Sequence, residues 1–296
     1  MKINLANQSL SPIDYDVRQY PDGQQDIVLK PIKYNFLDSA VTDREPVTIY
    51  SRMNSWKDIE LILCAVNALR RSGIENLHLE VPYILGARSD RQFVSYGTSY
   101  LVDVVAPVIN SCNFKKVTCL DAHSDVAGAC IKNLEVQGNY RVVANFFDAF
   151  KVNPQNCVIV SPDAGALKKI YSLLEDIDQN FNAQPELAIG MKHRDVKTGK
   201  ILSTDVMLPK EKEGDMSARI PTYVIVDDIC DGGRTFIELA KVLREKSYGC
   251  KVYLVVSHGI FSAGTDVLLE HLDGVFTTNS IRSTPDSARI KYQDVL

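Results

Sequence analysis

Short apolar runs rich in β-branched residues alternate with amphipathic stretches from about residue 46 onward. This alternation is typical of α/β proteins with parallel sheets, because each strand is followed by a helix that packs against the sheet. The pattern predicts strands at 47–50, 77–81, 117–120, 157–161, 187–189, 223–226, 252–256 and 275–277.

The clearest helix is predicted for residues 56–71. Asn54 or Ser55 can cap its first turn, and Gly73 stops it, because glycine tolerates the left-handed backbone that often follows a helix. One face carries apolar residues at helical spacing, which predicts that this face is buried. These residues are Ile59, Ile62, Leu63, Val66 and Leu69.

The pattern favours two domains over one. The strands could form a single large sheet, but the rhythm breaks between residues 138 and 155, and a similar pattern restarts at Cys157. We therefore expect an N-terminal domain of residues 1–143 and a C-terminal domain of residues 144–296. Such domains bind ligands at the carboxyl ends of their parallel strands, so we expect both sets of ends to face one cleft.

The composition narrows the classes of function. An apolar content of 45% with 24% charged residues is typical of a globular protein. The net charge of -4 argues against a general nucleic-acid binder. No apolar run approaches the ~20 residues that a membrane-spanning helix needs. The seven cysteines are scattered without a close pair, which favours reduced thiols and a cytoplasmic location.

The most informative segment, residues 227–235, lies between a predicted strand and a predicted helix. The first amides of a helix lack partners and carry the positive end of its dipole, so this position favours an anion. Glycines let the backbone close on a phosphate, and carboxylates accept hydrogen bonds from sugar hydroxyls. The segment therefore predicts a site for a phosphorylated sugar. Its residues are Asp227, Asp228, Asp231, Gly232, Gly233, Arg234 and Thr235.

The segment from residue 191 to residue 220 is mostly polar and has little apolar periodicity. A connection of this length inside a domain is typical of a lid or of a solvated loop. Lys192, His193 and Arg194 place three potential cations directly after the predicted strand 187–189. The functional interpretation is a lid that carries positive charge onto a phosphate, and the alternative is a surface loop without a role in binding.

A basic cluster follows the predicted strand 77–81. Arg88 and Arg91 lie on either side of Ser89 and Asp90. Two arginines can bind a phosphate chain bidentately while the aspartate orients them. A surface ion-pair loop is the alternative.

Three further clusters follow predicted strands. His123, after the strand 117–120, can ligate a metal, act as an acid or base, or be structural. Asp163, after the strand 157–161, is a helix cap or a ligand for a metal and a sugar. The hydroxyl-rich turn at residues 257–264 could form the far wall of a phosphate site.

Residues 223–235 resemble the ribose-phosphate loop shared by type I phosphoribosyltransferases and ribose-phosphate pyrophosphokinases. Further motifs occur in the order and rough spacing of the pyrophosphokinase family. They are Tyr20-Pro-Asp-Gly-Gln24, Pro82-Tyr83, Ala87-Arg-Ser-Asp-Arg91, Leu120-Asp-Ala-His-Ser124, Val160-Ser-Pro-Asp-Ala-Gly165, Lys192-His-Arg194, His258-Gly-Ile-Phe-Ser262 and Thr278-Asn-Ser-Ile281. The resemblance spans nearly the whole chain. It implies an α/β protein of two tandem type I phosphoribosyltransferase-like domains, each a mostly parallel sheet flanked by helices.

The resemblance also implies an activity. ATP would give its diphosphoryl group to ribose 5-phosphate, with Mg²⁺ as cofactor, to yield 5-phosphoribosyl 1-diphosphate (PRPP) and AMP. The family assembles as homo-oligomers, in which a neighbouring subunit completes the ATP site. By resemblance, Lys192 and Arg194 are the catalytic cations, and the loop 227–235 binds ribose 5-phosphate. The implied ATP-site residues are Asp22, Gln24, Arg88, Ser89, Asp90 and His123, and the implied metal-associated residues are His123 and Asp163.

Several positions depart from the family pattern. Gln24 stands where the family has glutamate, and Ser89 stands where it has glutamine. Gly232 and Arg234 replace a threonine and a glycine of its loop. These departures indicate a divergent member. Two other functions stay open: a phosphoribosyltransferase that consumes PRPP, and a non-catalytic partner of an active pyrophosphokinase.

Overall fold

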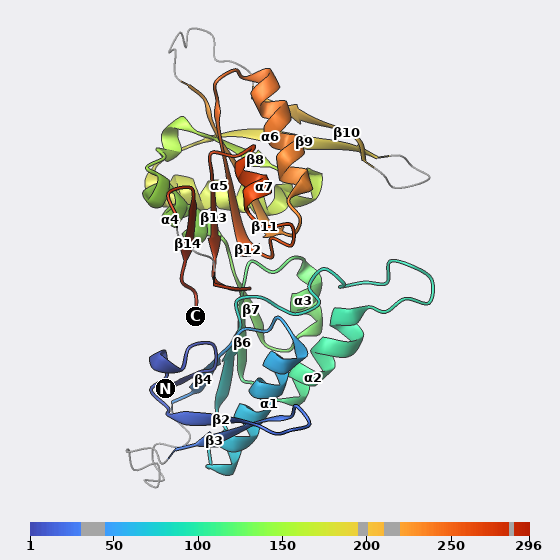
Figure 1. Cartoon of the computed structure of the whole chain (residues 1–296), viewed down its shortest axis with the longest axis vertical. Helices are drawn as coiled ribbons and strands as arrows, with labels where there is room; N and C mark the ends of the chain where they lie inside the picture. The colour runs from blue at the N-terminus through green and yellow to red at the C-terminus, as the bar shows by residue number, and fades with distance from the viewer. Residues whose placement is uncertain (31–44, 195–200, 210–219, 284–286) are drawn as a thin grey trace. The chain divides into compact units, whose positions relative to one another are not determined.

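The chain forms two compact units, each with its own sheet and helices (Figure 1). Unit 1 comprises Met1–Gln137 together with Val295–Leu296, and unit 2 comprises Gly138–Asp294. The computed structural model describes residues 1–30, 45–194, 201–209, 220–283 and 287–296.

The division between the units precedes the boundary predicted after residue 143. The helix α4, Tyr140–Phe150, belongs wholly to unit 2 because its aromatic side chains pack there. The ring centroid of Phe146 lies 5.5 Å from that of Tyr253 and 6.3 Å from that of Phe276. Sequence periodicity identified no element here, so the boundary could not be placed from the pattern alone.

The sheet of unit 1 is parallel throughout, with strand order β1-β4-β5-β6-β7. The predicted strands 47–50, 77–81 and 117–120 form its centre. The edge strands β1 and β7 were not predicted, because runs of three and four residues are too short for their alternation of apolar and polar residues to stand out. The strands are β1 Lys2–Asn4, β4 Val47–Tyr50, β5 Leu77–Glu80, β6 Lys116–Leu120 and β7 Leu134–Gln137.

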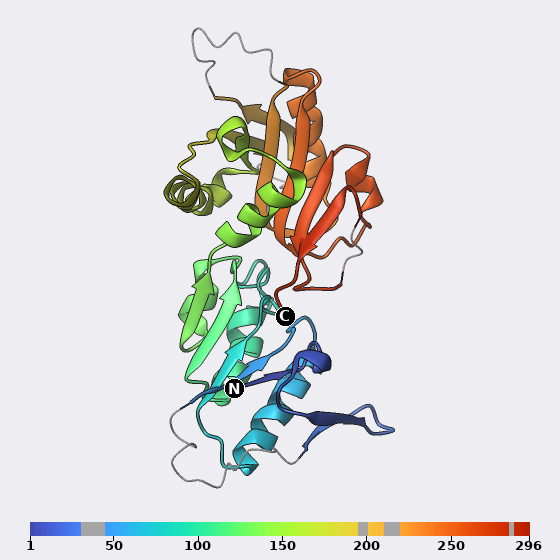
Figure 2. The ribbon, with the colours of Figure 1, turned by 90° about the vertical axis from the view of Figure 1, so that its left-hand side faces the viewer.

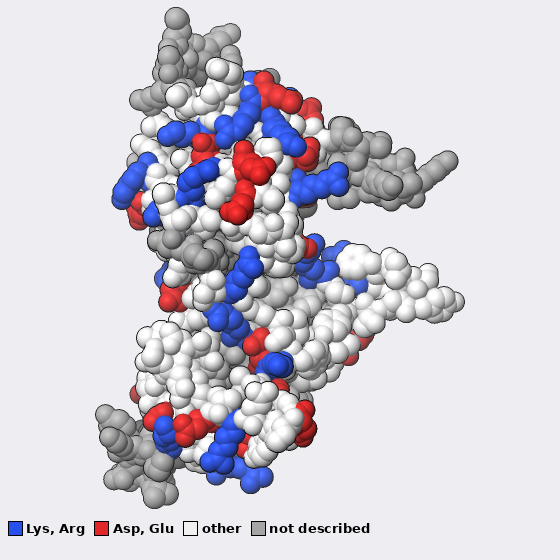
Figure 3. All heavy atoms as spheres, in the orientation of Figure 1, with Lys and Arg blue, Asp and Glu red and all other residues white. Residues whose placement is uncertain are grey.

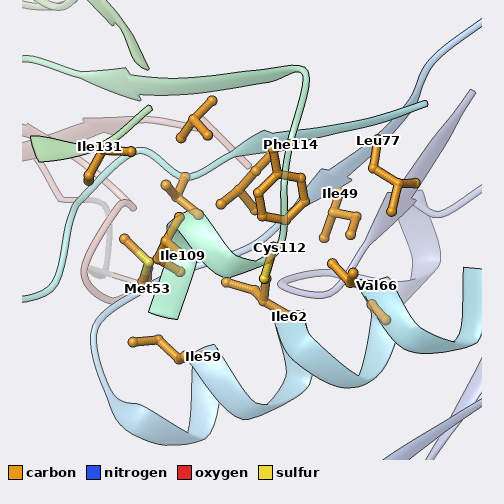
Figure 4. Close-up of a cluster of buried hydrophobic side chains, with 14 of the residues drawn as sticks. Ile49, Met53, Ile59, Ile62, Val66, Leu77, Ile109, Cys112, Phe114 and Ile131 are labelled. Atoms are coloured by element: carbon orange, nitrogen blue, oxygen red, sulfur yellow. The ribbon is translucent and has the colours of Figure 1, made fainter. Parts of the chain in front are cut away.

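The predicted helix 56–71 is present as α1, Trp56–Arg71. Ser55 is its cap: Ser55 Oγ accepts from the Asp58 amide, and Asp58 Oδ2 accepts from the Ser55 amide at 2.8 Å. Ile59 and Ile62 are fully buried in the core of unit 1 (Figure 4), whereas Leu63 is 37% exposed and was wrongly assigned to the buried face. The remaining helical segments of this unit are η1 Gln8–Leu10, η2 Tyr100–Val105, α2 Ala106–Ser111 and α3 Asp125–Cys130.

An antiparallel hairpin that the pattern did not predict, β2 Tyr15–Gln19 with β3 Gln25–Leu29, lies against α1 (Figure 1). The Gln25 amide donates to Glu60 Oε1 of α1 at 3.1 Å. In the turn of the hairpin, the Tyr20 amide donates to the Gln24 carbonyl at 2.9 Å. The turn therefore presents exposed side chains at the end of a two-stranded arm.

The sheet of unit 2 has the strand order β10-β9-β8-β11-β12-β13-β14 and is parallel except where β10 pairs with β9. Its strands are β8 Val158–Ser161, β9 Glu186–Arg194, β10 Ile201–Met207, β11 Thr222–Cys230, β12 Lys251–Gly259, β13 Gly274–Thr278 and β14 Ile290–Gln293. Its other helical segments are η3 Pro154–Asn156, η4 Ala164–Ala166, α5 Leu167–Phe181, α6 Arg234–Lys246 and α7 Asp266–Leu269. The fold class, two α/β units with mostly parallel sheets, is confirmed.

Helices cover both faces of this sheet (Figure 2). On β12, Tyr253 packs against α4, while Val252 and Leu254 belong to the core cluster that includes Phe236 and Leu239 of α6. Successive strand residues point to opposite faces, so α4 and α6 lie on opposite sides of the sheet. The central strands are therefore buried on both faces, as continuous apolar runs predict.

The segment 191–220 differs from the prediction of a long loop. The strand β9 continues through Arg194, and β10 returns antiparallel to it, with Thr204 opposite Lys192. Residues 195–200 and 210–219, on which the lid interpretation also rested, lie outside the described residues. The pattern did not predict a hairpin here because the segment is mostly polar, and a hairpin at the edge of a sheet need not bury an apolar run.

Basic and acidic side chains are interspersed on the face that Figure 3 shows. Within the described part of the chain, no helix is both long and apolar enough to cross a membrane.

Candidate functional site

The two adjacent aspartates lie at the carboxyl end of the central strand β11. This strand continues to Cys230, beyond the predicted end at residue 226, and Asp227 stands opposite Val256 of β12. Asp228 is only 5% exposed. The Asp228 amide donates to Asp227 Oδ1 at 2.9 Å, so the backbone itself orients the first carboxylate.

A lysine compensates the charge of the second carboxylate. Lys169 of α5 places its Nζ 3.3 Å from Asp228 Oδ2. Burial raises the pKa of the Asp227 carboxyl well above its usual range, and the adjacent charge of Asp228 adds to the shift. The two carboxyl groups therefore differ in their surroundings. Asp228 has a cation beside it, whereas burial and the charge of Asp228 make the ionised form of Asp227 unfavourable.

The turn from β11 into α6 requires a glycine at one position. Gly233 has φ +79° at the N-cap of α6, and a Cβ on it would lie 2.5 Å from Leu268 Cδ2. A Cβ on Gly232 would have Ser262 Oγ as its nearest neighbour, at 3.7 Å, so this position has room for a side chain. Arg234 and Thr235 then open α6, whose first amides point out of the helix toward a potential anion.

The turn after β12 packs directly on this loop, as expected for a far wall. Ser262 Oγ donates to Asp231 Oδ1 at 2.6 Å, and the Ile260 amide donates to the Cys230 carbonyl at 2.8 Å. Arg282 Nη2 in turn donates to the Phe261 carbonyl at 3.2 Å. These bonds hold the loop from the β12 side of β11. Burial raises the pKa of the Cys230 thiol to about 12, so this loop cysteine stays protonated.

Asp163 forms the helix cap that the sequence offered as one interpretation. Its Oδ1 accepts from the Gly165 amide at 3.0 Å and from the Ala166 amide at 3.3 Å. Its charge also contributes, after burial and Asp228, to the raised pKa of Asp227, so it lies in the same electrostatic neighbourhood. Among the described residues, no three His, Cys, Asp or Glu side chains converge as metal ligands.

Lys192 and Arg194 lie in the last part of β9, the second strand from the edge of the sheet. Lys192 stands opposite Thr204 of β10, and Arg194 stands opposite Ile201. A Cβ on Gly190, two positions before Lys192, would lie 2.6 Å from the Pro162 carbonyl oxygen. The strand that carries the two cations therefore passes directly beside the turn of Asp163.

In unit 1, Asp90 is the buried centre of the basic cluster, with 3% of its surface exposed. Ser124 Oγ donates to Asp90 Oδ2, and Arg91 Nε donates to Asp90 Oδ1 at 3.0 Å. The hydrogen bond from Arg91 is the main cause of the lowered pKa of Asp90, and Ser124 and the charge of His123 act in the same direction. The structure thus brings the two separate sequence clusters, 88–91 and 121–125, together at Asp90.

The other predicted ATP-site residues are placed on the surface of unit 1. Arg88 and His123 are exposed, and Ser89 is fixed by its backbone, since its carbonyl accepts from the Leu101 amide at 3.0 Å. Asp22 and Gln24 lie in the exposed hairpin turn, where Asp22 Oδ1 accepts from the Gln24 amide at 3.1 Å.

Sequence reasoning missed Lys169 and Ser124. Both reach an aspartate across a long chain separation, 59 residues for Lys169 and 34 for Ser124. A local signal for Lys169 did exist: α5 opens with Lys168 and Lys169 and has no acidic residue in its first turn, contrary to the preference set by the helix dipole.

Comparisons with known proteins agree with this geometry. A family described as "Phosphoribosyl synthetase-associated domain" matches residues 191–295. A ribose-phosphate pyrophosphokinase of Pasteurella multocida is 28% identical over 252 residues, which cover 80% of this chain and 71% of the relative. The corresponding protein of Bordetella pertussis is 26% identical over 289 residues, 94% of this chain and 82% of the relative.

The fold has a solved counterpart. The crystal structure of phosphoribosylpyrophosphate synthetase from Mycobacterium smegmatis superposes with a TM-score of 0.73 and 16% sequence identity. The match covers 99% of this chain and 94% of that one. The tandem type I phosphoribosyltransferase-like fold expected from the motifs is therefore confirmed.

Proposed function

The chain belongs to the ribose-phosphate pyrophosphokinase family, and we propose that it transfers the β,γ-diphosphoryl group of ATP to the anomeric hydroxyl of ribose 5-phosphate. The products are PRPP and AMP. The observation that carries this proposal is the loop from Asp227 to Thr235, where two strand-end carboxylates are followed by a glycine turn into a helix N-terminus. A sugar phosphate fits both ends of such a loop.

The sugar would bind with its hydroxyls on the aspartates and its 5-phosphate in the turn. Asp227 and Asp228 offer carboxylate oxygens as hydrogen-bond acceptors. The amides after Gly233 and the side chains of Arg234 and Thr235 would bind the phosphate. The bond from Ser262 to Asp231 supports this arrangement, because it braces the loop before any ligand arrives.

The diphosphoryl group would be handled by cations. Lys192 and Arg194 would meet the charge that develops on the transferring group, since such transfer depends mainly on positioning and electrostatic stabilisation. Mg²⁺ supplies positive charge to the nucleotide phosphates when it is bound, and the metal-associated residues that the resemblance implies are His123 in unit 1 and Asp163 in unit 2. A magnesium ion usually keeps several waters and binds one or two carboxylates together with substrate phosphates, which suits a chain without a three-ligand cluster among its described residues.

ATP would bind at the basic cluster of unit 1. Asp90 holds Arg91 in place, and Arg88, Ser89 and His123 complete the cluster on this subunit. We further propose a homo-oligomer in which Asp22 and Gln24 of the hairpin turn reach the ATP site of a neighbouring subunit. The exposure of this turn supports the proposal.

The reaction itself is the direct test. We would follow AMP and PRPP by phosphorus NMR in a mixture of protein, ATP, magnesium and ribose 5-phosphate. We expect both products to form only with the sugar present. Lys192→Ala should lower the rate by ~10²–10³, as for the loss of one group that stabilises the transition state.

Lys241→Ala is a matched control, because Lys241 forms an exposed ion pair with Glu238 on α6 at 3.1 Å. This variant should keep the wild-type rate. Production of AMP that does not depend on the sugar would contradict the proposal. Absence of AMP from folded protein would instead favour the phosphoribosyltransferase, which base-dependent release of diphosphate from PRPP would then reveal.

A further inference from the structure

We propose that Lys169 is a positioning residue that holds the carboxylate of Asp228 for the sugar hydroxyls and thereby controls the affinity for ribose 5-phosphate. The inference rests on the proposed function of the Asp227–Thr235 loop. Lys169 lies outside that loop and outside every motif that the sequence pointed to, and it acts through Asp228 rather than on the substrate.

The ion pair joins two elements at the site. Lys169 is in the first turn of α5, which follows the turn of Asp163, and its Nζ lies 3.3 Å from Asp228 Oδ2 at the end of β11. The side chain of Asp228 is 7% exposed and that of Lys169 is 33% exposed. The carboxylate is therefore largely shielded from water, so in the free protein its charge is compensated by a protein cation.

The acidic neighbourhood explains why a cation is needed here. Asp227 is adjacent to Asp228, and Asp163 adds a further negative charge to the surroundings of Asp227. Carboxylates this close repel one another, which turns them apart or protonates them. A carboxylate has several lone pairs, so Asp228 can accept from Lys169 and from a sugar hydroxyl at the same time. Lys169 therefore places a positive charge beside Asp228 and orients its carboxylate.

The position of Lys169 in its own helix supports a specific role. The first turn of a helix carries the positive end of the dipole and favours acidic side chains. The first turn of α5 has none, and Lys168 and Lys169 stand there instead. Placing positive charge at this end works against the stability of α5, and the contact with Asp228 offsets that cost.

A purely structural clamp between α5 and β11 would use the same ion pair, so the two roles must be separated by kinetics. We would measure the dissociation constant of ribose 5-phosphate by calorimetry, and KM and kcat for PRPP formation, for Lys169→Met and Lys169→Arg. We expect Lys169→Met to weaken sugar binding roughly tenfold or more, the usual effect of disturbing a hydrogen bond to a charged group. Because the bond is made before and during the reaction, KM for the sugar should rise while kcat and KM for ATP stay within about threefold.

Lys169→Arg should restore most of the affinity, because it returns a cation to Asp228. The matched control is Lys241→Met, which removes an exposed ion pair on α6. A double variant with Asp228→Asn makes the test specific: once Asp228 is neutral, Lys169→Met should cause no further loss of sugar affinity.

The outcomes are distinct. Wild-type protein that fails to bind ribose 5-phosphate overturns the proposed function and this inference together. Wild-type protein that binds the sugar, with Lys169→Met binding it equally well, overturns the inference alone. Lys169→Gln serves as a second neutral variant. If Lys169→Met and Lys169→Gln both fail to fold, or if they raise KM for ATP and for the sugar equally, Lys169 is a structural clamp and the inference is wrong.

Discussion

The loop of unit 2 and the basic cluster of unit 1 are both built at the ends of parallel strands, yet they differ in how much of each is held in place. In unit 2, Lys169, Ser262 and the backbone amide of Asp228 hold the aspartates from three directions. In unit 1, Asp90 is buried, and the basic side chains around it are exposed. The proposed sugar site is therefore preformed, whereas the proposed nucleotide site has one fixed anchor, Asp90, with exposed groups around it.

The difference has a physical reason. A preformed site loses little conformational entropy on binding, and it must carry the electrostatic cost of its buried charges in the free protein. The raised pKa of Asp227 is that cost. An exposed arginine has no such cost, but it must be ordered when the ligand binds. Substitutions in the two regions should therefore have different effects on folding and on binding.

The largest effect on stability is expected at the glycine turn of unit 2. Gly233→Ala should lower the free energy of unfolding by about 2–4 kcal/mol, because alanine resists φ +79° and its Cβ would meet Leu268. Chemical denaturation measures this loss. Gly232→Ala is the control, since its Cβ has room, and it should cost no more than ~0.5 kcal/mol. Equal losses of unfolding free energy for the two variants would show that the turn is not rigid at Gly233, and so that the sugar site is not preformed.

Asp227→Asn should weaken the sugar site and stabilise the fold. Loss of a charged hydrogen-bond acceptor should reduce kcat/KM for ribose 5-phosphate by roughly 10- to 100-fold. Because the folded pKa of Asp227 is raised, the folded state binds its proton more tightly than the unfolded state does. Wild-type stability is therefore lost as the pH rises from the unfolded pKa of ~4 through the folded pKa.

Thermal unfolding across pH measures the second effect. The variant lacks the carboxyl, so its Tm should exceed that of the wild type at pH 8, and the two should converge near pH 4. A difference in Tm that stays constant between pH 4 and pH 8 would show that the charge of Asp227 does not destabilise the fold.

The smallest effect is expected in unit 1. The lowered pKa of Asp90 means that its charge stabilises the fold above the unfolded pKa, and that this contribution is lost as the pH falls through the folded pKa. Its partner Arg91 is 63% exposed, so solvent screening keeps the contribution to ~1 kcal/mol or less. Asp90→Asn should therefore lower Tm slightly at pH 7, and the difference should shrink as the pH falls below the unfolded pKa of ~4.

Asp90→Asn should also separate the two proposed sites by its effect on ligand binding. Freeing Arg91 should raise KM for ATP about fivefold, the equivalent of ~1 kcal/mol, and leave the dissociation constant of ribose 5-phosphate unchanged. A change in sugar affinity as large as the change for ATP would mean that the two regions do not act separately.

Much of the fold could be predicted because its signals are local. The central strands and the helix Trp56–Arg71 follow from apolar periodicity, and the cap Ser55 lies beside the residues it serves. The edge strands β1, β7, β10 and β14 were missed because they are short or polar. The division between the units lies before the predicted boundary, because α4 belongs to unit 2 through contacts with distant residues such as Tyr253 and Phe276, which a sequence pattern does not reveal.

The sequence by itself determined the central strands, the helix Trp56–Arg71, the family, and the loop of carboxylates and glycines at a strand end, because each depends on residues close together in the chain. Only the tertiary structure decided which side chains serve that loop. Lys169 meets Asp228 across 59 residues, Ser262 meets Asp231 across 31, and Ser124 meets Asp90 across 34. Spacing in a sequence carries no information about such contacts, since they arise when separate strands align their carboxyl ends at one edge of a sheet.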